Sequence, residues 1–253
     1  MKDSFPRPPT QWLMRSLRRS AVPKTTKKRD VASLYEVGPR NVTTRNCAAN
    51  FGAPMPKISL TSLADIASVV GTQKVTKVRA IKKRGPYSPA VDFYKALREA
   101  LVTAHDNGWS KVNLLEIPHA QTDPKKVASY LSAINGYNKW WGQKTLQSFD
   151  APRSTYSKHG IDVLVTPETG IEAGTTQYVL KFYLNNEPLD TFKANLITAL
   201  MEMTLRDQCQ ATEVMAVLDV RRGKLFTMRS QLKTLKTVID AELAYVADLW
   251  DAL

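Results

Sequence analysis

The chain has 253 residues, 43% of them hydrophobic, which is enough for a folded core. No run approaches the roughly 20 apolar residues of a membrane span, so we expect no membrane partner. Residues 1–19 hold no apolar core of a secretory signal, and we therefore expect an intracellular, cytoplasmic protein with Cys47 and Cys209 as reduced thiols. An Arg- and Ser-rich amphipathic stretch, Trp12–Ser20, indicates organelle targeting as an alternative.

Positive charge is concentrated in the first third of the chain. Residues 1–86 hold 18 Lys and Arg against 4 Asp and Glu, a net charge of +14. Residues 87–253 hold 18 against 19, a net charge of −1. Such a basic segment is typical of proteins that bind a polyanion, and we expect the partner to be nucleic acid, either RNA or DNA.

Residues 1–56 are predicted to form an extended basic arm, because prolines interrupt them and apolar residues are sparse. One short helix is expected around Gln11–Arg19. Trp12, Tyr35 and Tyr87 are candidates for stacking on unpaired bases. The arm residues expected to contact phosphates are Arg15, Arg18, Arg19, Lys27, Lys28 and Arg29.

Residues 57–86 are predicted to form a small basic helix–strand element. Apolar residues at helical spacing predict a helix over Ser59–Val70, with Ser59 or Ser62 as candidate N-caps. The partly alternating segment Lys74–Ile81 predicts a basic strand at a sheet edge. The segment Lys82–Pro86 would end the element. The cations expected to contact nucleic acid here are Lys74, Lys77, Arg79, Lys82, Lys83 and Arg84.

A helix is predicted to begin at Ser88–Pro89, with Ser at the N-cap and Pro at the first helical position, and to end at Asn107–Gly108. Val112–Ile117 is expected to be a strand or a packed loop. The pair Asp123–Pro124 predicts the start of a second helix, which ends at Gly142. Within that helix the adjacent residues Trp140 and Trp141 point about 100° apart, so one of them is expected at a groove, at an interface or under the arm.

The rest of the chain alternates between strands and helices. Alternating apolar residues predict β-structure over Ile161–Leu184, and Asp190 is expected to begin a helix. Val214–Val220 and Leu225–Phe226 are predicted strands around a turn. The last helix, Ser230–Leu253, carries a heptad-like apolar seam that is expected to pack on its own chain, with homo-oligomerisation as the alternative.

This order of elements predicts an α+β fold, with a small, mainly antiparallel sheet flanked by helices and preceded by the basic arm. We expect three parts: the arm 1–56, the basic element 57–86 and a neutral α+β domain 87–253.

Several standard sites are absent from the sequence. It contains no phosphate-binding P-loop motif, no dinucleotide fingerprint and no nucleophile elbow. The histidines His105, His119 and His159 lack the ligand spacing of a zinc site. We therefore expect no cofactor, apart from Mg²⁺ if the chain is a nuclease.

One set of residues has the chemistry of a nuclease. Glu168 and Asp219 lie on neighbouring β-segments and could hold Mg²⁺, and Lys181 could stabilise charge on a phosphate. Over about 20 residues this arrangement resembles the PD-(D/E)XK nuclease site, with Pro167–Glu168 as the Pro–acid step, Lys181 as the motif lysine and Glu99 as the helix acid. The second acid of the motif is replaced by Val179.

The same residues also have structural interpretations. Glu168 would be a solvated hairpin residue, and Lys181 would face solvent or pair with an acid across the sheet. Asp219 would accept hydrogen bonds from the amides of the turn that follows it.

We therefore expect a nucleic-acid-binding protein that uses its basic N-terminal region for phosphate contacts. A metal-dependent nuclease is the first alternative. A structural subunit of a nucleoprotein or viral assembly, with protein partners that order the arm, is the second.

Overall fold

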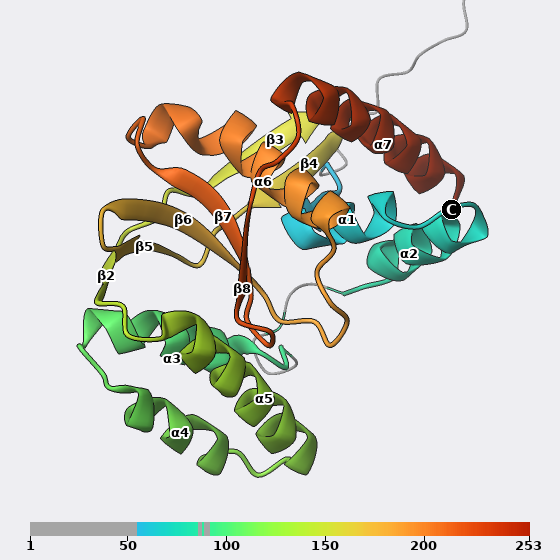
Figure 1. The fold of residues 1–253 in the computed structure, drawn as a ribbon. Coiled ribbons are helices and arrows are strands. Elements are labelled where there is room, and N and C mark those ends of the chain that lie inside the picture. The colour runs from blue at the N-terminus through green and yellow to red at the C-terminus, as the bar shows by residue number, and fades with distance from the viewer. Residues whose placement is uncertain (1–54, 86–87, 89–91) are drawn as a thin grey trace, which may run out of the picture. The chain divides into compact units, whose positions relative to one another are not determined.

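The computed structural model describes residues 55–85, 88 and 92–253, which belong to one compact unit (Figure 1). The arm cations Arg15, Arg18, Arg19, Lys27, Lys28 and Arg29 lie outside the described residues, as do Trp12, Tyr35, Tyr87 and Cys47. Within the described part, no helix combines the length and the apolar character needed to cross a membrane.

The described strands form two mixed sheets. The smaller has the order β1-β4-β3, in which β1 runs parallel to β4 and β3 runs antiparallel to it. Its strands are β1 (Lys57–Ser59), β3 (Ser154–Lys158) and β4 (Ile161–Val165). The larger has the order β2-β5-β6-β7-β8, and only its β6–β7 pair is parallel. Its strands are β2 (Leu146–Phe149), β5 (Thr169–Ala173), β6 (Thr176–Tyr183), β7 (Val214–Asp219) and β8 (Lys224–Thr227).

Helices pack around these sheets, which confirms the predicted α+β fold. They are α1 (Leu60–Ala67), α2 (Thr72–Lys82), α3 (Lys95–Asp106), α4 (Lys111–His119), α5 (Pro124–Trp141), α6 (Thr191–Leu205) and α7 (Leu232–Ala252), with a 3-10 turn at Arg206–Gln208.

Two apolar cores lie on opposite faces of the larger sheet. Along β6, Val179 and Tyr183 belong to the core that α1, α6 and α7 cover, whereas Leu180 and Phe182 belong to the core of α3, α4 and α5. This alternation follows from the period of two in a strand. Figure 1 shows α6 and α7 on one side of the sheet and α3, α4 and α5 on the other. Residues from β1, α1 and α2 share the first core.

Three predicted helix starts are confirmed by their capping hydrogen bonds. The side chain of Ser59 accepts from the Ser62 amide at 3.1 Å before α1. Asp123 accepts from the Lys125 amide at 2.8 Å before α5, and Asp190 accepts from the Lys193 amide at 2.8 Å before α6. Each bond satisfies an amide that the first helical turn leaves unpaired.

The last helix packs on its own chain, as expected from its seam. Leu235, Ile239, Leu243 and Val246 of α7 are buried in the first core.

The strand predicted over Lys74–Ile81 is wrong, because this segment is the helix α2. Val78 is fully buried, and Lys74 and Lys82, one turn to either side of it, both reach α7. Residues four apart share one face of a helix. In a strand, Lys74, Val78 and Lys82 would also point to one side, because an even spacing returns to the same face. The sequence pattern of this segment therefore fits both periods, and packing against α7 selects the helix.

Two further elements differ from prediction. Val112–Ile117 is neither a strand nor a loop, because α4 covers it, capped by reciprocal bonds between Ser110 and Asn113. The helix expected from Ser88 begins instead at Lys95, after Asp92 accepts a hydrogen bond from the Tyr94 amide at 3.1 Å.

Candidate functional site

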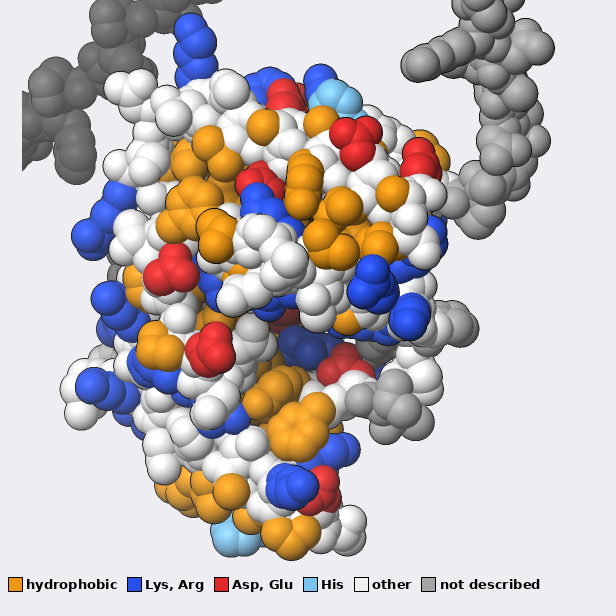
Figure 2. Space-filling model, turned by 90° about the vertical axis from the view of Figure 1, so that its right-hand side faces the viewer, with side chains coloured by type: hydrophobic (Ala, Val, Ile, Leu, Met, Phe, Trp, Pro, Cys, Tyr) orange, Lys and Arg blue, Asp and Glu red, His pale blue; other side chains and the backbone are white. Residues whose placement is uncertain are grey.

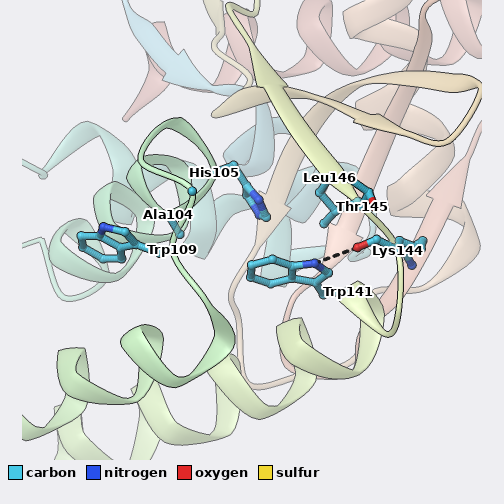
Figure 3. A pocket seen from close by; sticks show the side chains of 8 residues that line it. Ala104, His105, Trp109, Trp141, Lys144, Thr145 and Leu146 are labelled. Carbon is cyan, nitrogen blue, oxygen red and sulfur yellow. Dashed lines mark hydrogen bonds between the residues drawn. The ribbon is translucent and has the colours of Figure 1, made fainter.

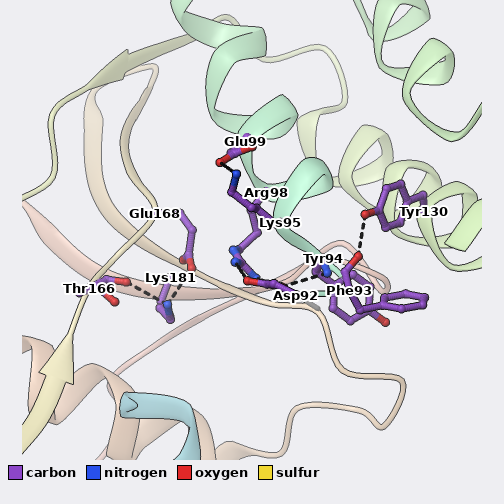
Figure 4. A network of polar contacts seen from close by, with 10 residues as sticks. All are labelled: Asp92, Phe93, Tyr94, Lys95, Arg98, Glu99, Tyr130, Thr166, Glu168 and Lys181. Atoms are coloured by element: carbon purple, nitrogen blue, oxygen red, sulfur yellow. Dashed lines mark hydrogen bonds and ion pairs between the residues drawn. The ribbon is translucent and has the colours of Figure 1, made fainter. Parts of the chain in front are cut away.

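The structure brings Glu168 and Lys181 together as an ion pair, 2.7 Å apart, with only 11% and 12% of their side chains exposed (Figure 4). Lys181 also donates to the Thr166 carbonyl at 2.9 Å, and the second oxygen of Glu168 accepts from the Phe182 amide at 2.6 Å. Lys181 is thus paired with an acid from the segment before β5, as its structural interpretation predicted. The interpretation of Glu168 as a solvated hairpin residue is wrong, because this pairing buries it.

Asp219 makes a separate set of contacts at the end of β7. Its side chain is 1% exposed and accepts from the Leu189 amide at 3.1 Å and from the Arg222 amide at 3.3 Å. The Arg222 guanidinium lies 3.4 Å away. The contact with the Arg222 amide agrees with the predicted bond to the following turn. No contact among the described residues joins Asp219 to the pair formed by Glu168 and Lys181.

The helix acid of the nuclease resemblance is also elsewhere. Glu99 forms an ion pair with Lys95 on the same helix at 3.2 Å, with 62% of its side chain exposed (Figure 4). Across the described ranges, no group of three or more His, Cys, Asp or Glu residues is arranged to hold a metal ion. The nuclease site therefore stays a prediction that rests on the sequence.

The basic residues of α2 divide into two groups. Lys74 and Lys82 bind α7: Lys74 pairs with Glu242 at 2.5 Å, and Lys82 donates to the Trp250 carbonyl at 2.6 Å. These two cations hold α2 against the core.

Arg79, Lys83 and Arg84, at the C-terminal end of α2, are exposed, and Lys77 is half-buried. None of the four has an ion-pair partner within the part of the chain that is described. Because α2 contains no acid, its cations have no partner one turn away. Figure 2 views the side on which α2 lies in Figure 1 and shows Lys and Arg side chains interspersed with single acids and hydrophobic patches.

A small aromatic pocket lies where α3 and α5 end (Figure 3). Its volume is about 210 Å³. The lining residues are Ala104, His105, Gly108, Trp109, Trp141, Lys144, Thr145 and Leu146. Trp141 is half-buried here, whereas Trp140 belongs to the core with 7% exposure. One of the two adjacent tryptophans therefore lines a hollow in the surface, here the aromatic pocket.

The titratable groups around this pocket have partners within the protein. Burial lowers the pKa of His105, although Asp106 opposes this, and the His105 Nε2 lies 2.6 Å from the Tyr137 hydroxyl. Burial and the neighbouring Lys111 lower the pKa of Lys144. Lys144 donates to the Trp140 carbonyl in the last turn of α5, and Lys111 donates to the carbonyl of the C-cap residue Gly142. Trp109 and Trp141 line the pocket, and their indole faces suit a flat ring.

A second, open groove of about 620 Å³ lies between α5 and the turn that joins β7 to β8. It is lined by Ser132, Asn135, Gly136, Lys139, Arg221 and Arg222. The sequence predicted a tryptophan at one of these hollows but not the open groove, because the residues that line the groove are far apart along the chain.

Comparison with known protein families finds no family model that matches this chain, and comparison with curated proteins finds no match.

Proposed function

We propose that this protein binds nucleic acid through its basic N-terminal third and does not itself catalyse a reaction. The observation that carries the proposal is the exposed, acid-free end of α2, where Arg79, Lys83 and Arg84 have no ion-pair partner among the described residues. Cations that are not paired within the protein can neutralise phosphates and release their counterions.

Charge and fold together support this assignment. The exposed end of α2 belongs to the segment 1–86, whose net charge is +14. Lys74 and Lys82 fix α2 to the core, so the remaining cations project from a positioned helix. A helix fixed in this way costs less conformational entropy on binding than a free basic chain would. Residues 1–54, with 11 Lys and Arg, would add further phosphate contacts.

The experiment measures fluorescence anisotropy of labelled single-stranded DNA, duplex DNA and single-stranded RNA of equal length, across salt concentrations and with Mg²⁺ present. The test variant carries Arg79→Gln, Lys83→Gln and Arg84→Gln. The control variant removes the same charge at three exposed lysines outside the basic third, with Lys125→Gln, Lys158→Gln and Lys233→Gln.

Binding should fall with salt, and the test variant should reduce the slope of log K against log salt by about 2 to 3, since each phosphate contact contributes about 0.7–0.9. The control variant should leave the slope unchanged. No binding by the full chain near physiological salt would overturn the proposal and favour the assembly alternative. Mg²⁺-dependent shortening of the probe, lost in Glu168→Ala or Lys181→Ala, would establish the nuclease instead.

A further inference from the structure

The groove between α5 and the β7–β8 turn is lined by hydrogen-bond donors. Ser132, Asn135 and Lys139 lie on α5 at a spacing of three and four residues, which places them on one face of the helix. All three are exposed and have no hydrogen bond or ion pair through their side chains within the described structure. They face the turn that supplies Arg221 and Arg222.

The two arginines are held in place by bonds that use only some of their donors. Arg221 donates through Nε to the Leu184 carbonyl at 3.0 Å and through Nη2 to the Tyr94 hydroxyl at 2.8 Å. Arg222 donates through Nη2 to the Asn186 carbonyl at 2.6 Å. A guanidinium carries five N–H donors, so each arginine keeps donors for a ligand. Their positions are set before any ligand arrives, which lowers the entropic cost of binding.

The charge of the groove is positive. Lys139, Arg221 and Arg222 contribute three cations, and the buried carboxylate of Asp219, which pairs with Arg222 at 3.4 Å, offsets one of them. Arg, Lys, Ser and Asn side chains all donate to phosphate oxygens. The groove is open as well as large, which suits a polymer that passes through it better than an enclosed small molecule.

From these contacts we infer that the groove binds a phosphate of a nucleic-acid backbone, as a second contact apart from α2. This inference rests on the proposed function, because it takes the same partner. Lys139 would provide the charge, Ser132 and Asn135 would add donors, and the two arginines would fix the register of the phosphate.

The test uses the full-length chain and whichever labelled nucleic acid binds it most tightly in the anisotropy experiment. The groove variant is Lys139→Glu, and the matched control is Lys125→Glu, an equal charge change at an exposed lysine in the first turn of the same helix. The two positions are about 21 Å apart along the helix axis. Both arginines are left intact because their contacts with Tyr94 and Asp219 support the fold. Circular dichroism and the thermal midpoint check that each variant is folded, and Lys139→Gln replaces the reversal if it is not.

We expect Lys139→Glu to weaken binding about tenfold, the equivalent of one charge-assisted hydrogen bond, and Lys125→Glu to change it less than twofold. The triple α2 variant, measured alongside, separates the two proposals. If only the α2 variant loses nucleic-acid binding, the inference about the groove is overturned and the proposed function is kept. If only Lys139→Glu loses binding, the inference about the groove is kept and the assignment of phosphate contacts to α2 is overturned. Equal loss in Lys139→Glu and Lys125→Glu overturns the groove, and no binding by the unaltered chain overturns both.

Discussion

The carbonyl oxygen of Gly136 lies 2.4 Å from the position that a Cβ atom on Gly223 would occupy. In the other direction, a Cβ atom on Gly136 would lie 2.2 Å from the Val220 carbonyl oxygen. Helix α5 and the β7–β8 turn therefore pack main chain against main chain. This close approach fixes the distance between the two walls of the groove.

Gly136→Ala should destabilise the protein. In an exposed helix this change would stabilise by about 1 kcal/mol, because alanine has the higher helix propensity. Here the new methyl group meets main-chain atoms that cannot rotate away, so overpacking should lower the free energy of unfolding by about 2 kcal/mol in urea denaturation. Gly85→Ala is the control, since no atom lies within 4 Å of its Cβ position, and it should change stability by less than about 0.5 kcal/mol. Similar results for the two variants would contradict the packing described for α5.

Local sequence signals predicted the elements that local interactions determine. Asp123 followed by Pro124 predicted the start of α5, and Asp190 predicted the start of α6, because capping depends on neighbouring residues. The basic segment Lys74–Ile81 was assigned wrongly because α7, far away in sequence, determines which face is buried. The short strand β1 was missed for a related reason: its parallel partner β4 is distant along the chain.

The candidate sites follow the same division. The basic end of α2 was visible in the sequence because its residues are contiguous. The groove was not, since Lys139 and Arg221 come from separate elements that only tertiary packing, including the close approach of Gly136 to the turn, brings together. For Glu168 and Lys181 the sequence left open whether they pair, and the register of β5 and β6 answers this by bringing Glu168 against the Lys181 side chain.

The ion pair between Glu168 and Lys181 should contribute to stability. Glu168→Gln would leave the ammonium of Lys181, which is 12% exposed, without its counter-charge, and we expect a loss of about 3 kcal/mol in the free energy of unfolding. The double variant Glu168→Gln/Lys181→Met should recover part of that loss, because no unpaired charge remains. A double-mutant cycle in urea measures the coupling. Additive effects of the two changes would show that the pair is not coupled.

His105 should make the protein less stable in mild acid. Burial lowers its pKa in the folded chain below the ordinary 6.5, so the unfolded chain binds the proton first as the pH falls. The stability that neutral His105 contributes is complete above about pH 6.5, the ordinary pKa of histidine. It is lost as the pH drops toward the lowered pKa of His105 in the folded chain. Urea denaturation at pH 7.5 and pH 5.5 should therefore show a smaller difference for His105→Gln than for the unaltered chain. His119→Gln, at an exposed position on α4, is the control and should keep the full difference. An unchanged pH dependence in His105→Gln would assign the effect to other groups.

Lys74 and Lys83 should have opposite phenotypes although both are cations of α2. Lys74 pairs with Glu242 at 2.5 Å, with 17% and 16% of the two side chains exposed. The other Glu242 oxygen, Oε2, has no hydrogen-bond partner among the described residues, so Lys74→Met would leave this carboxylate without its main contact. We expect a loss of about 2 kcal/mol in the free energy of unfolding.

Lys83→Met removes a charge that contacts solvent, so stability should change by less than about 0.5 kcal/mol. Nucleic-acid binding should nevertheless weaken, with a salt slope lower by about 0.7–0.9, because one phosphate contact is lost. Lys74→Met, measured where it is still folded, should keep the slope of the unaltered chain, since its ammonium is already neutralised by Glu242. If the two variants instead reduced the slope equally, binding would depend on the total charge of the basic third and not on which cations α2 leaves unpaired.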